Sequence, residues 1–162
     1  MEIKTLMDAF ARPGIVERIT IRPVRVQPVV EVQSVEAVAN RGLRGDRYNN
    51  SGGSRQVTLI QAEHLEAIAS MLGVTAVDFK LTRRNILVRG INLVALKGHR
   101  FRIGSAVLSY SGECHPCSRM ETALGTGGYN AMRGHGGITA RVVDGGEISI
   151  GATVEPLRSD VD

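Results

Sequence analysis

The two cysteines, Cys114 and Cys117, are the most reactive side chains in this sequence, and they form a C-x-x-C pair. Such a pair can be half of a zinc site, a thioredoxin-like redox pair, or a frame for one reactive thiol at a helix start. Structural zinc needs two further ligands, but there is no second C-x-x-C or H-x3-H, and His64, His99 and His135 are scattered. A redox pair needs a preceding βαβ pattern, which the sequence does not show.

The third use of the pair, one reactive thiol, points to Cys117. This residue follows Pro116, and proline is common in the first turn of a helix. A thiol there would lie near the positive end of the helix and near Arg119, and both favour the thiolate. The alternative is that both cysteines are small apolar side chains without a reaction. The spacing leaves open whether Cys114 or His115 contributes.

Arginine is the second chemical feature of the chain. Lys and Arg together number 20, only Lys4, Lys80 and Lys97 are lysines, and the formal net charge is +4. Guanidinium groups bind phosphate and carboxylate through planar, bidentate hydrogen bonds, whereas an ammonium is a point charge. We therefore expect an anionic partner, although the base composition of a genome can also enrich arginine.

Three segments rich in arginine or glycine are candidate binding loops. Residues 41–48 include Asp46 and Arg47, Arg84 and Asn85 stand at the start of an expected strand, and residues 125–137 include Arg133. The third segment is long enough to cover a ligand as a lid, and the alternative is a mobile surface loop. Solvated turns and strand ends would explain the first two without any function.

A set of short strands must position these loops. Apolar alternation and β-branched residues predict strands over residues 15–26, 29–38, 56–60, 85–88, 99–103, 106–110, 138–143, 147–150 and 153–154. Helical spacing predicts a helix over residues 61–72, ended by Gly73, another over residues 117–124, and a helical turn near residues 74–80. Many short strands with few helices indicate a mainly β fold, as a barrel or a curled sheet.

Composition excludes several classes of protein. The chain has 162 residues, enough for one domain, and 43% hydrophobic with 22% charged residues is typical of globular proteins. No apolar run reaches the roughly 18 to 20 residues of a membrane-spanning helix, and the N-terminus lacks a secretory apolar core. Two cysteines are too few for a disulfide scaffold. We therefore expect a cytoplasmic protein without a membrane partner.

In their order and spacing these segments resemble the MOSC domain, the module named after the C-terminal part of molybdenum cofactor sulfurase. The resemblance covers residues 15–157 and leaves an N-terminal arm at residues 1–14 and a C-terminal tail at residues 158–162. The matching motifs are Gly45-Asp46-Arg47, Arg55-Gln56-Val57-Thr58-Leu59, Arg84-Asn85-Ile86, Gly104-Ser105-Ala106-Val107-Leu108, Pro116-Cys117 and Ala140-Arg141-Val142-Val143-Asp144-Gly145-Gly146-Glu147-Ile148. The chain departs from the family at Gly151-Ala152, where Gly-Asp is frequent.

The resemblance implies a MOSC-type β-barrel that stands alone, with Cys117 as its functional cysteine. It also implies a bound molybdenum cofactor (molybdopterin), a pterin that bears a phosphate. Cys117 would be the molybdenum ligand and the catalytic residue, either in sulfur carriage or in molybdenum-dependent reduction of N-hydroxylated compounds. The residues expected to bind the phosphate or the pterin edge, or to orient the groups that do, are Asp46, Arg47, Arg84, Asn85 and Arg133.

Two partners follow from what the resemblance leaves out. No segment matches the pyridoxal-phosphate desulfurase domain of the full sulfurase, so sulfur would come from a separate cysteine desulfurase, and electrons from an electron-transfer partner. The alternative function is a non-catalytic barrel that binds a phosphorylated metabolite or nucleic acid. Nucleic acid is disfavoured, because aromatic residues are 4% of the chain and tryptophan is absent, so few side chains could stack on bases.

Overall fold

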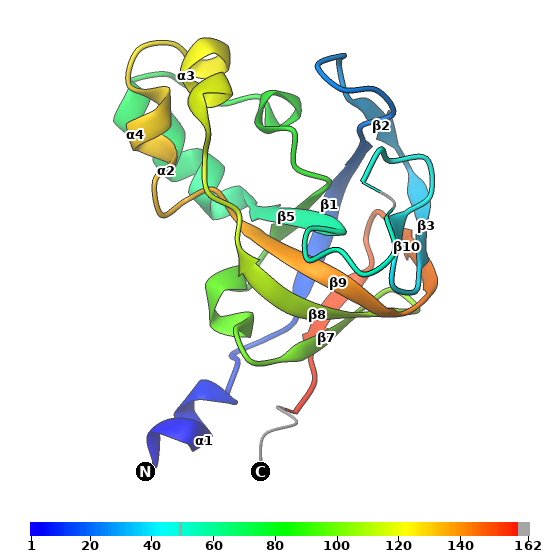
Figure 1. Ribbon diagram of the computed structural model, residues 1–162. Helices are drawn as coiled ribbons and strands as arrows, with labels where there is room; N and C mark the ends of the chain where they lie inside the picture. The colour runs from blue at the N-terminus through cyan, green and yellow to red at the C-terminus, as the bar shows by residue number, and fades with distance from the viewer. Residues whose placement is uncertain (49, 159–162) are drawn as a thin grey trace.

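The computed structural model describes residues 1–48 and 50–158, and the described residues form a closed β-barrel of seven strands (Figure 1). The strands follow one another in the order β11-β7-β8-β9-β5-β6-β1, and β11 pairs again with β1 to close the barrel. β5 and β6 are parallel, and the other neighbours are antiparallel. The barrel strands are β1 (Gly14–Ile21), β5 (Val57–Gln61), β6 (Ile86–Arg89), β7 (Arg100–Ile103), β8 (Ala106–Glu113), β9 (Ile138–Asp144) and β11 (Thr153–Pro156).

A second, smaller sheet lies beside the barrel. It consists of β10 (Gly146–Ser149), β3 (Ser34–Val38) and β4 (Gly42–Leu43), while β2 (Val30–Val32) pairs with β1 as a hairpin. Because side chains alternate across a strand, every second residue points into the barrel, and the core there is entirely apolar in its centre. Its largest fully buried side chains include Ile19, Leu59, Phe101, Ile103 and Leu108.

The helices α2 (Ala62–Leu72), α3 (Ser118–Leu124) and α4 (Gly128–Met132) gather at one end of the barrel (Figure 1). They share a second apolar cluster with β5, β6 and the 3-10 helix η1 (Phe79–Thr82). Ile68, Phe79, Met120 and Met132 are buried in it. α1 (Ile3–Met7) lies at the opposite end, and η2 (Leu93–Leu96) is a second 3-10 turn. This apolar cluster therefore holds α3 against the neighbouring helices and the end of the barrel.

The expected mainly β barrel is confirmed, and several expected elements are present in detail. The hairpin of β7 and β8 turns at Gly104, whose φ of +59° is a conformation that favours glycine. α2 ends at Gly73, which has a left-handed φ of +70°, and α3 begins directly after Cys117.

Three expected elements differ from the sequence-based prediction. The first strand ends at Ile21 rather than at residue 26, because the backbone N–H of Arg22 donates to the Asp46 carboxylate and Pro23 follows. The helical turn expected over residues 74–80 lies at η1 instead, where Asp78 accepts a hydrogen bond from the backbone N–H of Lys80. Residues 125–137, expected as a lid or a mobile loop, contain α4, which packs into the second apolar cluster.

The expected arm at residues 1–14 and tail at residues 158–162 stay predictions. Residues 1–14 contain α1, none of whose residues is buried. Of the expected tail, residues 159–162 lie outside the described residues. Within the described part of the chain, no helix combines the length and the apolar character that a membrane span requires.

Candidate functional site

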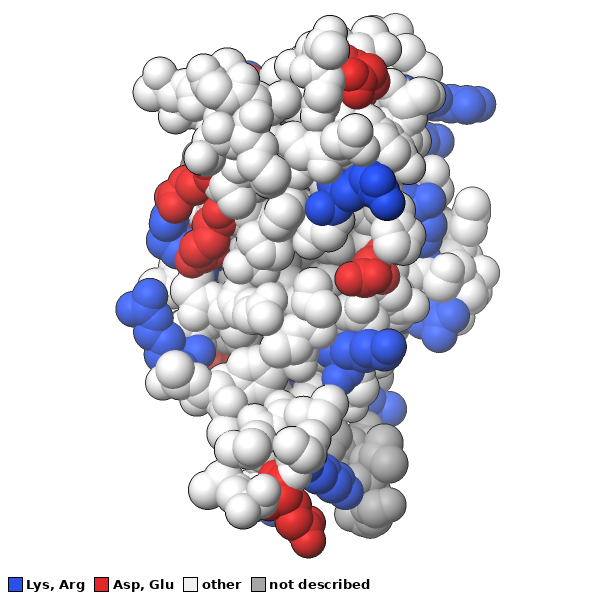
Figure 2. Space-filling view, turned by 90° about the vertical axis from the view of Figure 1, so that its left-hand side faces the viewer, with Lys and Arg blue, Asp and Glu red and all other residues white. Residues whose placement is uncertain are grey.

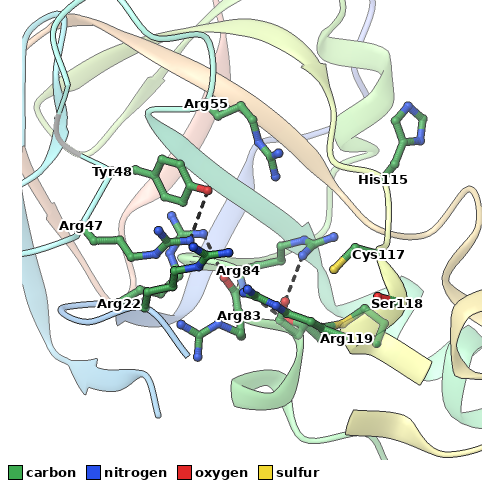
Figure 3. Close-up of a pocket in the computed structure, with 13 residues that line it drawn as sticks. Arg22, Arg47, Tyr48, Arg55, Arg83, Arg84, His115, Cys117, Ser118 and Arg119 are labelled. Atoms are coloured by element: carbon green, nitrogen blue, oxygen red, sulfur yellow. Dashed lines mark hydrogen bonds between the residues drawn. The ribbon is translucent and has the colours of Figure 1, made fainter. Parts of the chain in front are cut away.

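A cavity of about 570 Å³ opens between the barrel and α3, and arginine dominates its lining (Figure 3). Seven of the thirteen described residues that line it are arginines, and none of the thirteen is Asp or Glu. The lining residues are Arg22, Arg25, Arg47, Tyr48, Arg55, Thr82, Arg83, Arg84, His115, Cys117, Ser118, Arg119 and Met120. Segments far apart in the chain therefore meet in one positively charged cavity.

Elsewhere on the molecule the charges are mixed. Figure 2 shows one face, on which Asp and Glu side chains are interspersed with Lys and Arg. Arg89, outside the cavity lining, bridges both Glu17 and Glu66. The excess of positive charge in the cavity lining is thus a local feature and does not follow from the net charge of the chain alone.

Cys117 lies at the N-terminal end of α3, where it is the capping residue and is exposed to solvent. Cys114, three residues earlier, is buried, and its sulfur lies 3.9 Å from a terminal nitrogen of Arg55. The two thiols of the C-x-x-C pair are therefore not equivalent, because only Cys117 lines the cavity and is open to a ligand.

Arg84 holds the segment that carries the cysteines. Its guanidinium donates three hydrogen bonds to backbone carbonyls: to Gly136 O at 2.8 Å, to Thr82 O at 3.0 Å and to Cys114 O at 3.0 Å. The side chain is 7% exposed, and burial lowers the pKa of Arg84, an effect that the nearby Cys114 opposes. Arg84 is therefore a positioning residue for the loop before Cys117 as well as part of the cavity wall (Figure 3).

Two glycines allow the turn before β9 to approach the cysteine segment closely. A Cβ on Gly136 would lie 2.2 Å from the carbonyl oxygen of Cys114, and a Cβ on Gly137 would lie 1.9 Å from that of Leu59. The backbone N–H of Cys114 donates to Gly137 O at 2.8 Å. The glycine content of this segment thus has a structural role, namely to place Cys114 against the barrel.

Asp46 and Asn85 form a buried polar network around Arg22. The Asp46 carboxylate accepts from Arg22 Nε at 3.1 Å and from Arg22 Nη2 at 3.0 Å, in an ion pair almost shielded from water. Asn85 is fully buried; its Nδ2 donates to Asp46 Oδ1 at 3.1 Å, and its Oδ1 accepts from the backbone N–H of Thr58 at 3.0 Å. This network directs the guanidinium of Arg22 toward the cavity, so Asp46 and Asn85 orient an arginine rather than line the cavity themselves.

Arg47 and Tyr48 form the wall of the cavity that lies across from Cys117 (Figure 3). The guanidinium of Arg47 lies 4.4 Å from the Tyr48 ring centroid, and that of Arg22 lies 4.9 Å from it. Arg47 Nη2 also donates to the Tyr48 hydroxyl at 3.2 Å (Figure 3). Cation–π contacts on this ring hold two positive charges close together without a carboxylate between them on the cavity side.

Two guanidinium nitrogens at the cavity are buried without a hydrogen-bond partner among the described residues: Nε of Arg47 and a terminal nitrogen of Arg83. Burial lowers the pKa of Arg83, and the positive charges of Arg22, Arg47 and Arg119 lower it further. Buried donors are rarely left unpaired in proteins, and like charges gathered in one place repel one another. An anion in the cavity would relieve both costs.

The residues expected from the sequence divide into three groups. Cys117, Arg47 and Arg84 line the cavity, whereas Asp46 and Asn85 stand behind it. Arg133 is exposed at the C-terminal end of α4 and is not among the described lining residues. Sequence reasoning did not single out Arg22, Arg25, Arg55 and Arg83 as binding residues, although Arg55 and Arg83 stand inside or beside the quoted motifs.

A metal at Cys117 would need ligands from outside the protein. Among residues 1–48 and 50–158, no three His, Cys, Asp or Glu side chains come together in a way that could hold a metal ion. One exposed thiol beside a set of arginines would instead suit a metal that arrives already bound to an anionic organic group.

Comparisons with known proteins agree with this fold. The family model described as MOSC domain matches residues 46–155, more than half of the chain. The crystal structure of the YuaD protein from Bacillus subtilis is similar with a TM-score of 0.79 and 19% identity, over 90% of this chain and 96% of that one. YiiM from Geobacillus stearothermophilus is similar with a TM-score of 0.73 and 18% identity, over 92% of this chain and 77% of that one.

YiiM from Escherichia coli is similar with a TM-score of 0.69 and 19% identity, over 91% of this chain and 72% of that one. At such identities the structural likeness establishes the fold alone. No curated relative matches the chain at a significant level.

Proposed function

Because the chain belongs to the MOSC domain family, which is linked to molybdenum cofactor sulfurase, we propose that its arginine-lined cavity binds the phosphate-bearing pterin of the molybdenum cofactor, with the Cys117 thiolate as the protein ligand of the metal. One observation carries the proposal: an exposed thiol and seven arginines line one cavity that, among the described lining residues, contains no carboxylate.

The lining fits a phosphate group well. Arg47 Nε and a terminal nitrogen of Arg83 are buried donors without partners in the described chain, and phosphate oxygens would accept from them. Arg22, whose Nε and Nη2 are held by Asp46, would add a positive charge beside the phosphate. Besides the His115 imidazole, Tyr48 offers the one aromatic face among the described lining residues, although two guanidinium groups already lie over that ring.

Each of these cavity residues then has a distinct role. The arginines bind the anion, Arg84 fixes the backbone before Cys117, and Cys117 presents a soft donor atom to the metal. When bound, the cofactor would supply the two-electron redox chemistry that reduction of N-hydroxylated compounds requires, with electrons from a separate partner. A cytoplasmic location, where a free thiol stays reduced, is consistent with this role and stays a prediction.

Sulfur carriage is the second role that the exposure of Cys117 favours. The Cys117 thiolate would attack the terminal sulfur of a persulfide on a cysteine desulfurase, so that a new S–S bond forms at Cys117 and the donor cysteine leaves as a thiolate. The adjacent arginines would stabilise both anions. Mass spectrometry of the protein after incubation with a desulfurase and cysteine should then find one added sulfur on Cys117, and sulfur found only on Cys114 would contradict this role.

The proposal is tested by the content of molybdenum and pterin in protein purified from a host that synthesises the cofactor. Wild type should retain both, and Arg47→Ala should retain less, because Arg47 lines the cavity. Arg102→Ala is the matched control, because Arg102 is an exposed arginine on β7 outside the cavity lining. Wild-type protein without pterin, or equal losses in both variants, would contradict the proposal.

The rival function, a barrel that binds a phosphorylated metabolite or nucleic acid without chemistry, makes a different prediction. Its affinity for short oligonucleotides would fall steeply with salt, because binding would depend on phosphate contacts. We expect no such binding, because Tyr48 and His115 are the only aromatic rings among the described residues of the cavity wall.

A further inference from the structure

A second pocket adjoins the arginine-lined cavity, and its walls are mostly apolar. It has a volume of about 410 Å³, within the usual range for small-molecule sites. Val26, Pro28 and Val29 of the β1–β2 loop form one wall, Leu81 of η1 another, and Ala123 of α3 a third. Below, this space is called the apolar pocket.

The apolar side chains around this pocket are unusually open to water. Val26 is 68% exposed and Leu81 43%, and both are large apolar residues that line the pocket. Scattered exposed apolar residues are ordinary, but several that face one concave space indicate a binding site. Val26 also has a left-handed φ of +68°, which is costly for a β-branched residue and is typical of segments shaped by a ligand.

Of the polar residues that line the pocket, Arg83 stands on its boundary with the arginine-lined cavity. Arg83 lines both spaces, and one of its terminal nitrogens is buried without a partner among the described residues. Its other terminal nitrogen donates to Gln27 O at 2.5 Å, so Arg83 also fixes the β1–β2 loop. Lys80 adds a second positive charge, while the Asp78 carboxylate already accepts from the backbone N–H of Lys80.

The position of the pocket along α3 sets its distance from the thiol. Ala123 lies six residues after Cys117, which corresponds to roughly 9 Å along the helix at the usual rise per residue. A ligand that occupied the apolar pocket could therefore extend past Arg83, which lines both spaces, toward Cys117.

We propose that the apolar pocket holds the apolar body of a small substrate whose polar or anionic head passes Arg83 and reaches the cavity beside Cys117. This inference rests on the proposed function, because it assigns the substrate class of the same site. An apolar body is favoured by the lining of Val26, Pro28, Val29 and Leu81, and an anionic head by the positive charges of Lys80 and Arg83.

The test uses 1-anilinonaphthalene-8-sulfonate, an apolar ring system with an anionic head, whose fluorescence rises in an apolar site. Wild-type protein should bind the dye at one saturable site. Leu81→Glu should weaken binding roughly tenfold, because a charge would enter the apolar wall. Met71→Glu is the matched control, because Met71 is 54% exposed on α2 and does not line the pocket. Equal affinity of the two variants would overturn the proposal.

Methyl NMR of the unsubstituted protein locates the dye independently of any variant. Resonance shifts should centre on Val26, Val29, Leu81 and Ala123, and shifts centred on Ile3 and Leu6 of α1 would overturn the proposal. Leu81→Glu should keep the wild-type content of molybdenum and pterin. A failure of the proposed function would appear as wild-type protein without pterin, whereas a failure of this inference would appear only in the dye experiments.

Discussion

Replacement of Asp46 by Asn tests whether the network behind the cavity controls the arginine in front of it. The Asp46 carboxylate accepts from the backbone N–H of Arg22 at 2.7 Å, from the Arg22 guanidinium, from the backbone N–H of Tyr48 at 3.1 Å and from Asn85. Asn preserves the shape of the side chain but removes its charge, and one of its two polar atoms becomes a donor that faces other donors. Arg22, which is 6% exposed, would then be a buried cation without a counter-charge.

The structure sets the size of the effect. Removing one partner of a buried ion pair costs about 3–5 kcal/mol, because the other charge stays buried and unpaired. For a chain of this length each kcal/mol lowers Tm by about 2–4 °C, so we expect a decrease of roughly 6–20 °C. Arg22→Met removes the cation instead, and the double variant should cost less than the sum of the single variants, with a coupling energy of about 2 kcal/mol.

Urea unfolding of wild type, the two single variants and the double variant measures these free energies of unfolding. Calorimetric titration with pyrophosphate measures the affinity of the cavity for an anion. Asp46→Asn should weaken pyrophosphate binding, because Arg22 would no longer be directed into the cavity. Glu36→Gln is the matched control, because Glu36 pairs with Arg44 in a salt bridge exposed to water. Loss of this bridge should barely change the urea concentration at the midpoint of unfolding. The reasoning is refuted if Asp46→Asn is as harmless as Glu36→Gln, or if the effects of Asp46→Asn and Arg22→Met simply add.

Three further changes have defined outcomes. Gly136→Ala should destabilise the protein by about 1–3 kcal/mol in urea, because its Cβ would lie 2.2 Å from the Cys114 carbonyl oxygen, and wild-type stability would contradict that close approach. Burial, together with the charge of His135, lowers the pKa of His64 below 6.5, so the unfolded chain binds a proton more readily and stability is lost as pH falls through this range. His64→Gln should therefore flatten the decline of Tm below pH 6.5, and an unchanged decline would exclude His64 as its source. Arg133→Ala should leave pyrophosphate affinity unchanged, because Arg133 is exposed outside the cavity lining, and a clear loss would show that residues 125–137 close over the ligand.

The position of Cys117 could be predicted because its signals are local. A proline directly before the cysteine and apolar residues at helical spacing after it identify a helix start, and α3 begins at Ser118. The same holds for the β7–β8 hairpin and for the end of α2 at Gly73, where neighbouring residues alone determine the conformation.

Arg22 could not be predicted because its role depends on a contact distant in sequence. Its counter-charge, Asp46, lies 24 residues later, and between them the chain passes through β2, β3 and β4. In the sequence, Arg22 is one arginine beside a proline, with no spacing that relates it to Asp46. The return of the chain through β3 and β4, outside the barrel, brings the two side chains together.

Arg133 shows what local reasoning cannot resolve. Glycines and a basic residue within residues 125–137 indicated a loop over a ligand, but Ala131 and Met132 bury their side chains in the apolar cluster around α2. Their burial fixes the orientation of α4, and the next residue, Arg133, remains exposed outside the cavity. Composition identified a candidate segment, whereas packing determines which of its side chains reach the site.

The most direct test of the central claim is the molybdenum content of Cys117→Ser and Cys114→Ala proteins purified beside wild type from a host that synthesises the cofactor. Only Cys117 is an exposed thiol in the cavity, whereas Cys114 is buried behind it. We predict that Cys117→Ser loses the metal while Cys114→Ala retains it in the wild-type amount. Full retention of molybdenum by Cys117→Ser would contradict the assignment of its thiolate as the metal ligand.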